Sequence, residues 1–447
     1  MKRTTLKALL AAAAFPLLVS ACGNGSSGSE ASGQIDYWLW DANQLPAYQA
    51  CADAFEKRNP ELTVKITQLG WDDYWNRITT GLVSGTAPDV FTNHLSMYPD
   101  FAAKNQILPI DEYVERDNVD VDAYANGLAD LWVSEEGERY GLPKDWDTIA
   151  IFYNRQMLED AGVKEAELSD LTWNPQDGGT YEDLIAHLTV DKNGVRGDEP
   201  DFDKDNVAVY GLGLEDSGGG MGQTQWSMYT GTTGWTSTNK PTWGTEYNYD
   251  DPRFQETIAW WEGLIDKGYM PSFEAATAGV SVNDQFGAGK VAMSTNGSWM
   301  IGSYFGYKGI ETGVAPTPVG PDGERSSMFN GLADAIYAGT DNEEGAWKWV
   351  KFLGSTECQD LVAEEAVVFP ALPSSLKLAE KNFQAKGVDT EAFTTHLEQN
   401  TTFLYPITEN AADVEAIMRP SMDAVVAGKT DPSSLTEANE QVNALFQ

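Results

Sequence analysis

Short strands and helices alternate in the first hundred residues, and this alternation limits the fold more than any other feature. The runs IDYWLWDANQ (35–44), ELTVKITQLG (61–70) and APDVFTNH (87–94) have the composition of strands that end in turns. A segment that begins at Pro46 and the segment 71–85 carry apolar residues at helical spacing. This order predicts an α/β fold with a parallel sheet covered on both faces, in which ligands bind at the carboxyl ends of the strands.

The middle of the chain has a different composition. Residues 188–248 are rich in Gly, Asp, Asn, Thr and Trp, which predicts long ordered loops on a second lobe. Regular helices are predicted again at 251–268, at 341–366 and at 431–447. With 447 residues, 42% of them hydrophobic, the chain is long enough for two or three domains or lobes.

The N-terminus has the pattern of an export signal. A basic start precedes an apolar run, 9–19, that is too short to anchor the chain in a bilayer. The sequence VSAC, which ends at Cys22, resembles the lipobox of bacterial lipoproteins and so predicts cleavage before Cys22 and its acylation. The alternative is an ordinary signal peptide with an incidental cysteine. We expect a signal peptide at 1–21, a flexible tether at 22–33, and an extracytoplasmic body anchored to the cell membrane by lipid alone.

The formal net charge is -39, which makes nucleic acids and anionic lipid surfaces unsuitable partners. The same charge favours a neutral or cationic ligand. The alternative is that the acidic residues only keep an exported protein solvated.

Three cysteines are present, and acylation of Cys22 would leave Cys51 and Cys358 in an oxidising compartment. A disulfide between these two is then allowed, although the sequence does not show whether their Cα atoms approach closely enough.

Several segments in a fixed order resemble one protein family. They are NPELTVKITQLGWDDYWNRITTGLVSGTAPDVF, NQILPIDEYV, RYGLPKDWDTIAIFYNRQMLEDAG and FGAGKVAMSTNGSW. Together they resemble the carbohydrate-binding members of the bacterial extracellular solute-binding proteins, the family-1 type related to maltose-binding protein. The resemblance extends from about Ile35 to the C-terminus, and no single motif carries it.

The resemblance implies a two-lobed periplasmic-binding-protein type II fold, or Venus flytrap, in which each lobe is an α/β sandwich. Hinge crossovers would lie near 144–148, near 330–334 and within 369–380. Approximate boundaries follow from these crossovers. Lobe 1 would comprise 34–145 plus 333–375, and lobe 2 would comprise 146–332 plus 376–447.

The implied function is that of a receptor and not of an enzyme. A monomeric, lipid-anchored protein would bind a neutral oligosaccharide between its lobes and deliver it to the permease subunits of an ABC transporter, with no cofactor required. The identity of the sugar does not follow from the sequence.

Sugars stack their C–H faces on aromatic rings and need paired donors and acceptors for their hydroxyls. Trp299, in STNGSWM, resembles the family segment that carries a stacking aromatic; the alternative is a core tryptophan. Asp41 could instead cap the following helix. A metal role for His94 is weaker, because no second histidine lies nearby. The candidate ligand-binding residues are Trp299, Asp41, Asn43, Asn93, His94, Asp145, Asp147, Asn330, Gly331, Trp226, Trp235 and Tyr405.

An acidic segment, DKNGVRGDEPDFDKDN, is a candidate loop for a structural Ca²⁺ ion. It departs from the EF-hand pattern, because its glycine comes too early and its last position is not Glu. The alternative is a solvated acidic turn. The candidate ligands are Asp191, Asn193, Asp198, Asp201 and Asp203.

Two other functions compete with transport. A secreted glycoside hydrolase could use Asp145 and Asp147 as its carboxylate pair, but residues so near each other on one segment rarely flank a scissile bond. A surface adhesin could bind glycans without feeding a permease. The hinge-type fold that the resemblance implies argues for delivery.

Overall fold

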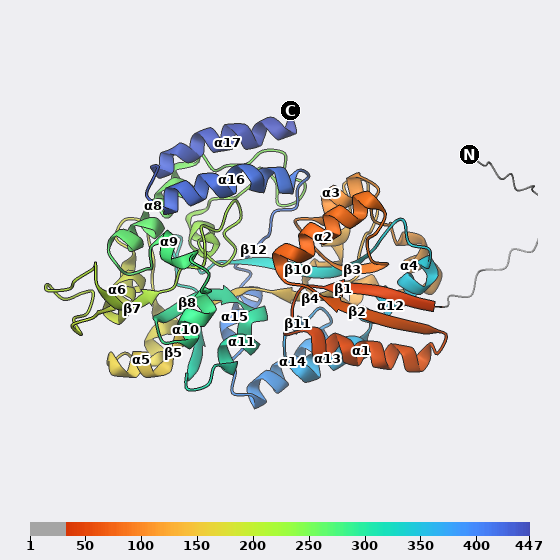
Figure 1. Cartoon of the computed structure of the whole chain (residues 1–447), viewed down its shortest axis with the longest axis horizontal. Coiled ribbons are helices and arrows are strands. Elements are labelled where there is room, and N and C mark those ends of the chain that lie inside the picture. The colour runs from red at the N-terminus through yellow and green to blue at the C-terminus, as the bar shows by residue number, and fades with distance from the viewer. Residues whose placement is uncertain (1–32) are drawn as a thin grey trace, which may run out of the picture. The chain divides into compact units, whose positions relative to one another are not determined.

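The computed structural model describes residues 33–447, apart from the side chain of Asn126. The predicted signal peptide, most of the tether and Cys22 lie outside these residues. The strands form two sheets toward opposite ends of the described region (Figure 1). The first sheet has the order β11-β4-β10-β3-β1-β2, with β12 beside β10. Its strands are β1 (Gly33–Leu39), β2 (Leu62–Gln68), β3 (Val90–His94), β4 (Pro143–Asp147), β10 (Ser327–Ile336), β11 (Phe369–Pro370) and β12 (Thr402–Leu404).

The first three strands run parallel, as the sequence predicts. β1 pairs in parallel with β2 on one side and with β3 on the other, whereas β10 pairs antiparallel with both β3 and β4. All five residues of β3 are buried, because helices cover both faces of the sheet. The carboxyl ends of β1 and β3 therefore lie at one edge of the sheet.

Helices α2 and α3 lie on one face of the first sheet, and α1, α13 and α14 lie on the other (Figure 1). A disulfide between Cys51 of α1 and Cys358 of α13 joins two of them, with the Cα atoms 5.1 Å apart. The predicted pairing of these cysteines is confirmed. The helical elements of this lobe are α1 (Leu45–Arg58), α2 (Trp71–Ser84), α3 (Tyr98–Ala103), α4 (Asp111–Asp117), η1 (Val121–Ala123), η2 (Ala125–Trp132), α12 (Glu343–Leu353), α13 (Thr356–Glu365) and α14 (Pro373–Ala385).

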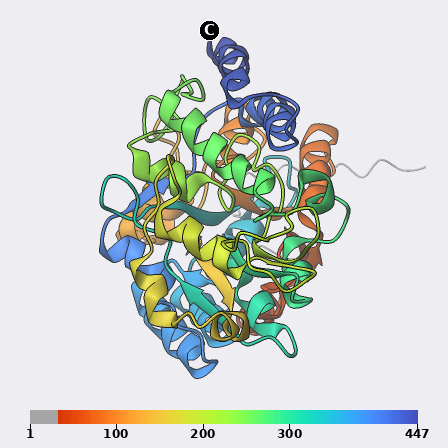
Figure 2. The same ribbon diagram turned by 90° about the vertical axis from the view of Figure 1, so that its left-hand side faces the viewer.

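The second sheet has the order β6-β7-β8-β5-β9. Its strands are β5 (Ile149–Asn154), β6 (Val190–Asp191), β7 (Val207–Leu212), β8 (Val291–Gly297) and β9 (Thr312–Ala315). Figure 2 views this end of the molecule, where long loops and short helices surround the sheet. The helical elements are α5 (Arg155–Asp160), η3 (Glu165–Asp170), α6 (Gly179–Leu188), α7 (Ser227–Thr230), η4 (Gly231–Thr233), α8 (Pro252–Asp266), α9 (Phe273–Ala276), α10 (Val282–Gly287), η5 (Ser298–Met300), α11 (Ile301–Gly306), α15 (Glu391–Glu398), α16 (Ala411–Val426), η6 (Pro432–Ser434), α17 (Leu435–Asn443) and η7 (Ala444–Phe446).

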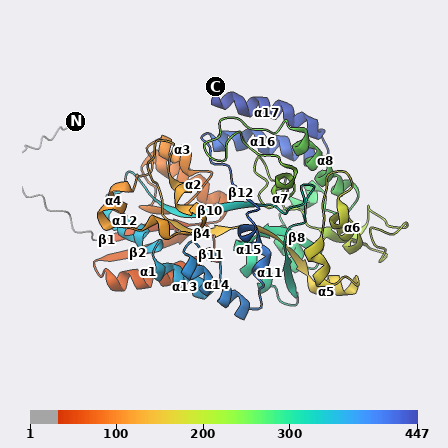
Figure 3. The same ribbon diagram turned by 180° about the vertical axis from the view of Figure 1, so that it is seen from behind.

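The chain passes from the first sheet to the second at Thr148, a single buried residue between β4 and β5. Its hydroxyl donates to the carbonyl of Phe393 in α15, and its carbonyl accepts from the N–H of Ser298. The next backbone N–H, of Ile149, donates to Oγ of Ser327 at 2.8 Å. Side chains and backbone from three distant segments therefore hold this crossover. One of these segments, α15, lies near the middle of the molecule in Figure 3.

The structure moves the approximate lobe boundaries by a few residues. β4 keeps Trp146 and Asp147 in the first sheet, and β10 joins that sheet from Asn330 onward. The third crossover follows α14, which packs against α13, and so lies beyond the predicted segment 369–380.

Candidate ligand-binding cleft

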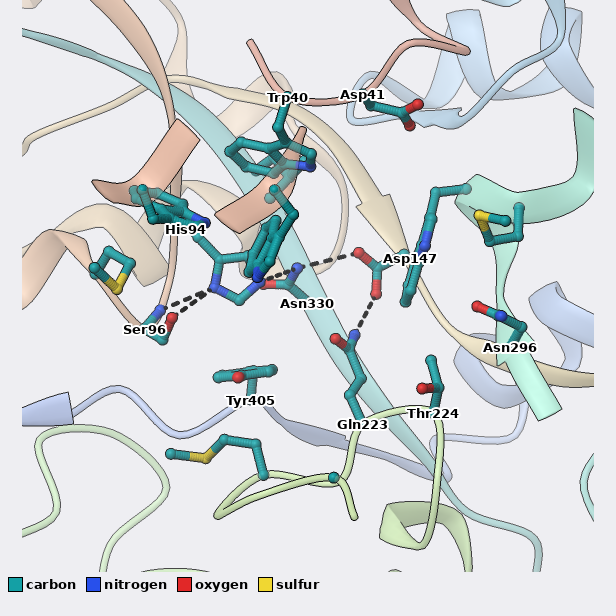
Figure 4. A pocket seen from close by; sticks show the side chains of 18 of the residues that line it. Trp40, Asp41, His94, Ser96, Asp147, Gln223, Thr224, Asn296, Asn330 and Tyr405 are labelled. Atoms are coloured by element: carbon teal, nitrogen blue, oxygen red, sulfur yellow. Dashed lines mark hydrogen bonds between the residues drawn. The ribbon is translucent and has the colours of Figure 1, made fainter. Parts of the chain in front are cut away.

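A cavity of about 720 Å³ lies between the two lobes, within the range of roughly 300–1,000 Å³ that is usual for ligand sites. Loops that follow β1 and β3, the start of α2, and strands β4 and β10 line it from the first lobe. The loop after β7, the segment from β8 into η5, and α16 line it from the second lobe. Figure 4 shows side chains from both lobes converging on this space.

Aromatic rings form the wall on the first lobe. Trp40 follows β1, and its ring lies 5.1 Å from that of Trp71 and 5.5 Å from that of Trp75, both at the start of α2. His94 ends β3 and packs edge-on against Tyr405 at 4.8 Å. Because parallel strands end at the same edge of a sheet, chain segments far apart in sequence place their rings together. Trp71 is 48% exposed, so this wall remains open to solvent.

A chain of hydrogen bonds crosses the centre of the cleft (Figure 4). Asn330 Nδ2 lies 3.0 Å from His94 Nε2 and donates to Asp147 Oδ2 at 3.1 Å. On the other side of the ring, His94 Nδ1 accepts from the N–H of Ser96 at 3.2 Å and lies 2.9 Å from Ser96 Oγ. Burial lowers the pKa of His94 to about 3, so the ring is neutral at physiological pH. From the second lobe, Gln223 Nε2 donates to the other oxygen of Asp147 at 2.8 Å.

Three carboxyl groups line this side of the cleft, two on strand β4 and one in the turn after β1. Burial raises the pKa of Asp145 to about 7, and it also raises the pKa of Asp41 and of Asp147. Lys144 opposes the shift at Asp145, but its own partner is Asp334 at 3.1 Å, and both of these side chains are 1% exposed. Lys144 is therefore buried and already paired with Asp334, and it does not line the cleft.

A second acidic group lies across the cleft, at the end of β7 and on α16. Arg419 pairs with Glu415 at 2.6 Å and with Asp216 at 3.5 Å. The side chain of Glu215 lines the cleft. Partial removal from solvent raises the pKa of its carboxyl to about 7, and the nearby charge of Asp216 raises it further. Burial also raises the pKa of Glu415.

Trp299, in η5, lies on the cleft wall with its ring against the backbone of Gly297. A Cβ atom built on Gly297 would lie 1.8 Å from the Trp299 ring. Because any side chain at position 297 would clash with the indole, only glycine there allows Trp299 to lie in this position.

Residues 41–360 match the family model described as bacterial extracellular solute-binding protein. The chain belongs to this family. The solute-binding protein is thus a binding protein and not an enzyme, and its family is extracellular. Within residues 33–447 no helix has the length and apolar character needed to cross a membrane.

Similar proteins extend along nearly the whole chain. The maltooligosaccharide ABC transporter solute-binding lipoprotein of Streptococcus pneumoniae serotype 4 is 24% identical over 453 residues, which cover 96% of this chain and 93% of that protein. An ABC substrate-binding protein of Listeria monocytogenes, solved with cycloalternan, has a TM-score of 0.80 at 19% identity and covers 93% of this chain and 99% of its own. The GacH receptor of Streptomyces glaucescens, solved unliganded and with acarbose, has a TM-score of 0.72 at 22% identity and covers 93% and 98%. These likenesses confirm the predicted two-lobed fold.

The structure brings seven of the predicted binding residues to the cleft wall. They are Trp299, Asp41, His94, Asp145, Asp147, Asn330 and Tyr405. Asp41 does not cap α1: its carboxylate accepts from the N–H of Asn43 and from Gln44 Nε2, and so fixes the turn after β1.

Three predicted residues near the cleft do not line it. Asn43 donates to Ser303 Oγ at 3.1 Å and so connects the first lobe to α11 of the second. Asn93 is fully buried, and its Oδ1 accepts from the N–H of His94. Gly331 lies in β10, where a Cβ atom would come within 2.9 Å of Leu128.

The two loop tryptophans belong to the core of the second lobe. Trp235 stacks on Phe254 at 4.8 Å. Trp226 is fully buried and supports the loop above it, where Gly222 has a φ of 53° and a Cβ atom would lie 2.0 Å from the Trp226 ring. That loop presents Gln223 to the cleft, so Trp226 shapes the site without lining it.

Sequence reasoning missed several residues that line the cleft. Trp71 and Trp75 begin a helix directly after β2, and this position at the carboxyl edge of the sheet was a usable signal. Glu215, Gln223 and Arg419 reach the cleft from a long loop and a distant helix, and no local pattern in the sequence indicates this.

The predicted calcium loop is a turn held by its own backbone. The carboxylate of Asp191 accepts from the N–H groups of Asn193, Val195 and Asp203, and Asp198 contacts His187. Among the described residues, no three acidic, histidine or cysteine side chains are grouped closely enough to hold a metal ion. Calcium binding at this loop therefore stays a prediction without a preformed site.

Proposed function

We propose that the solute-binding protein captures a saccharide in its interlobe cleft and passes it to the permease of an ABC transporter. The cleft lining carries this proposal, because both lobes contribute to it, with aromatic rings on the first and amide and carboxylate groups on both. Rings such as Trp40 and Trp299 suit the C–H faces of sugars, and the polar groups suit their hydroxyls. The ligands named for similar proteins, maltooligosaccharide, cycloalternan and acarbose, support a saccharide of more than one unit.

Delivery requires the receptor to stay near the membrane and to signal that it is loaded. A lipid on Cys22 and the flexible segment after it would supply the first requirement. Closure of the lobes about the crossover at Thr148 would supply the second, since only a ligand that touches both lobes favours the closed form. We propose that the protein acts as a monomer in this role.

A melting screen against a panel of oligosaccharides tests the proposal. We expect at least one to raise the melting temperature and to bind with a dissociation constant of micromolar or better, roughly 8 kcal/mol, by titration calorimetry. Chromatography of the recovered ligand should show an intact saccharide. If no saccharide stabilises the protein, the proposal is wrong, and shorter products would instead indicate a glycoside hydrolase.

The lipid anchor is tested separately. Mass spectrometry of protein extracted from membranes should show a chain that begins at an acylated Cys22. An unmodified Cys22 would remove the anchor and leave the saccharide cleft as proposed, because the two depend on different residues.

A further inference from the structure

The charge of the cleft is strongly one-sided. Six carboxyl groups line it, and they are Asp41, Asp145, Asp147, Glu215, Asp216 and Glu415. Among the cleft-lining residues of the described chain, the one permanent cation is Arg419. Ion pairs to Glu415 and Asp216 already occupy this guanidinium.

The other basic groups near the cleft cannot balance the remaining carboxylates. His94 lines the cleft, but burial lowers the pKa of its ring to about 3, so the ring is neutral. Lys144 is 2% exposed and donates to Tyr37, Thr92 and Asp334. These donations use all three of its hydrogens. The cleft wall therefore contains three carboxyl groups that no cation on the cleft side pairs with. We call them the β4 carboxyl group, and they are Asp41, Asp145 and Asp147.

A buried carboxyl in this region lacks adequate donors. Asp145 is 2% exposed and accepts one side-chain hydrogen bond, a long one of 3.4 Å from the Tyr48 hydroxyl. Asn330 is also 2% exposed, and its amide lies between His94 and Asp147. Figure 4 shows Asn330 at the centre of the cleft. Buried polar groups of this kind are normally satisfied, so a ligand is expected to supply the donors.

An ammonium group matches this set better than a hydroxyl does. It offers three donors and no acceptor, whereas each hydroxyl brings one donor and two acceptor lone pairs. Bonds from an ammonium to carboxylates are charge-assisted and are roughly twice as strong as neutral ones. Burial raises the pKa of Asp145 to about 7, in keeping with a carboxyl that has no cation on the cleft side.

The tryptophans of the cleft suit a ligand that is also a sugar. Trp75 lines the cleft, and its indole Nε1 is buried without a partner among the described residues, so it needs an acceptor such as a hydroxyl oxygen. Trp40 and Trp71 add ring faces that attract both C–H groups and cations. We propose that the saccharide carried by this protein is an amino sugar whose protonated amine binds the β4 carboxyl group. The inference rests on the proposed function, which concerns saccharides in general.

The first test compares matched sugars by titration calorimetry. The probes are glucosamine, galactosamine and mannosamine, and the β-1,4-linked dimer and trimer of glucosamine. Each is compared with its N-acetylated form and with its neutral parent. We expect at least one free-amine sugar to bind about tenfold or more tightly than both of its uncharged counterparts. We also expect its affinity to fall severalfold when salt is raised from about 0.02 to 0.5 M.

The second test uses matched variants. Asp145→Asn should weaken binding of the amine sugar about tenfold more than it weakens binding of the matched neutral sugar. Asp122→Asn removes the same charge from an exposed position on η1 outside the cleft, and it should change neither. Because the Asn side chain keeps the shape of Asp145, loss of the amine preference would report charge rather than misfolding.

Three outcomes separate this inference from the proposed function. A neutral sugar that binds as tightly as its amine counterpart overturns the amine and leaves the saccharide receptor standing. An amine preference that survives in Asp145→Asn overturns the assignment to the β4 carboxyl group. Failure of every saccharide, charged or neutral, counts against both proposals.

Discussion

At the scale of single residues, Trp299 and Gly297 act as one unit. The indole lies against the glycine backbone, in a space that a Cβ atom would fill. We expect Trp299→Ala to weaken saccharide binding by about 1–3 kcal/mol, because a stacking surface is lost. Gly297→Ala should weaken it as well, since the methyl group displaces the ring.

Calorimetry on the two single variants and the double variant checks this coupling. In the Trp299→Ala background, Gly297→Ala should have almost no further effect on affinity. Additive losses would show that Gly297 acts independently of the ring. Unchanged affinity in Trp299→Ala would remove the indole from the site.

Asp145 gives a pH-dependent contribution to stability. Its pKa is about 7 in the folded protein, whereas an unfolded aspartate titrates near 3.9, so the folded state binds the proton more tightly. Stability contributed by the protonated form is therefore present below about pH 4 and is lost as pH rises toward 7. We expect Asp145→Asn to be more stable than the native protein at pH 8 by roughly 1–3 kcal/mol.

Urea unfolding of unliganded protein at pH 4 and pH 8 measures this difference. The gain should shrink toward pH 4, where the Asp145 carboxyl is protonated in the folded state and about half protonated in the unfolded state. Asp122→Asn, at an exposed position outside the cleft, is the matched control. A gain of equal size at both pH values would contradict the shifted pKa.

Between elements, Ser327 supplies one of the hydrogen bonds that hold the crossover from β4 to β5. The N–H of Ile149 and Oγ of Ser327 are fully buried and pair at 2.8 Å. Ser327→Ala leaves that N–H without a partner, and we expect a loss of about 1–3 kcal/mol in the free energy of unfolding. Ser326→Ala is a matched control, because its hydroxyl makes no hydrogen bond recorded within residues 33–447. Equal stability of the two variants would show that Ser327 does not support the crossover.

The disulfide connects α1 to α13 across a long loop of chain. Cys51 and Cys358 are fully buried and neither lines the cleft. We expect reduction, or replacement of both cysteines by alanine, to lower stability by about 2–4 kcal/mol and to leave saccharide affinity unchanged. Thermal unfolding with and without a reductant measures the loss. If the reductant also lowers the melting temperature of the double alanine variant, its effect does not come from this disulfide.

The sequence predicts well those elements whose own residues carry the pattern. Strands β1, β2 and β3 and helices α1, α2 and α8 lie close to their predicted ranges, because apolar periodicity and turn residues mark their ends. The continuous helix expected at 341–366 divides into α12 and α13 around Gly354 and Ser355. Local pattern does not determine how helices pack, so this break and the place of α14 needed the structure.

In the candidate site too, local pattern identifies some residues, and the packing of distant segments determines the others. Asp41, His94 and Asp147 follow or belong to predicted strands and were found from that position. Trp226 and Trp235 were wrong as cleft residues, because composition alone does not separate a loop aromatic from a core aromatic. Gln223 reaches Asp147 across the cleft only through the arrangement of the two lobes.

At the scale of the whole molecule, neither lobe is built from one continuous stretch of chain. β10 lies between β3 and β4 in the first sheet, although more than two hundred residues separate it from β3. In the second lobe, Val414, Met418 and Met422 of α16 complete a core that begins at Ile149.

This connectivity has a consequence for how the protein is made. During synthesis, the early strands cannot form a finished sheet until β10 has emerged, and the second core stays incomplete until α16 follows. We therefore expect neither lobe to reach its final packing while most of the chain is being produced. A chain without finished lobes would be in the condition that passage through a translocation channel requires.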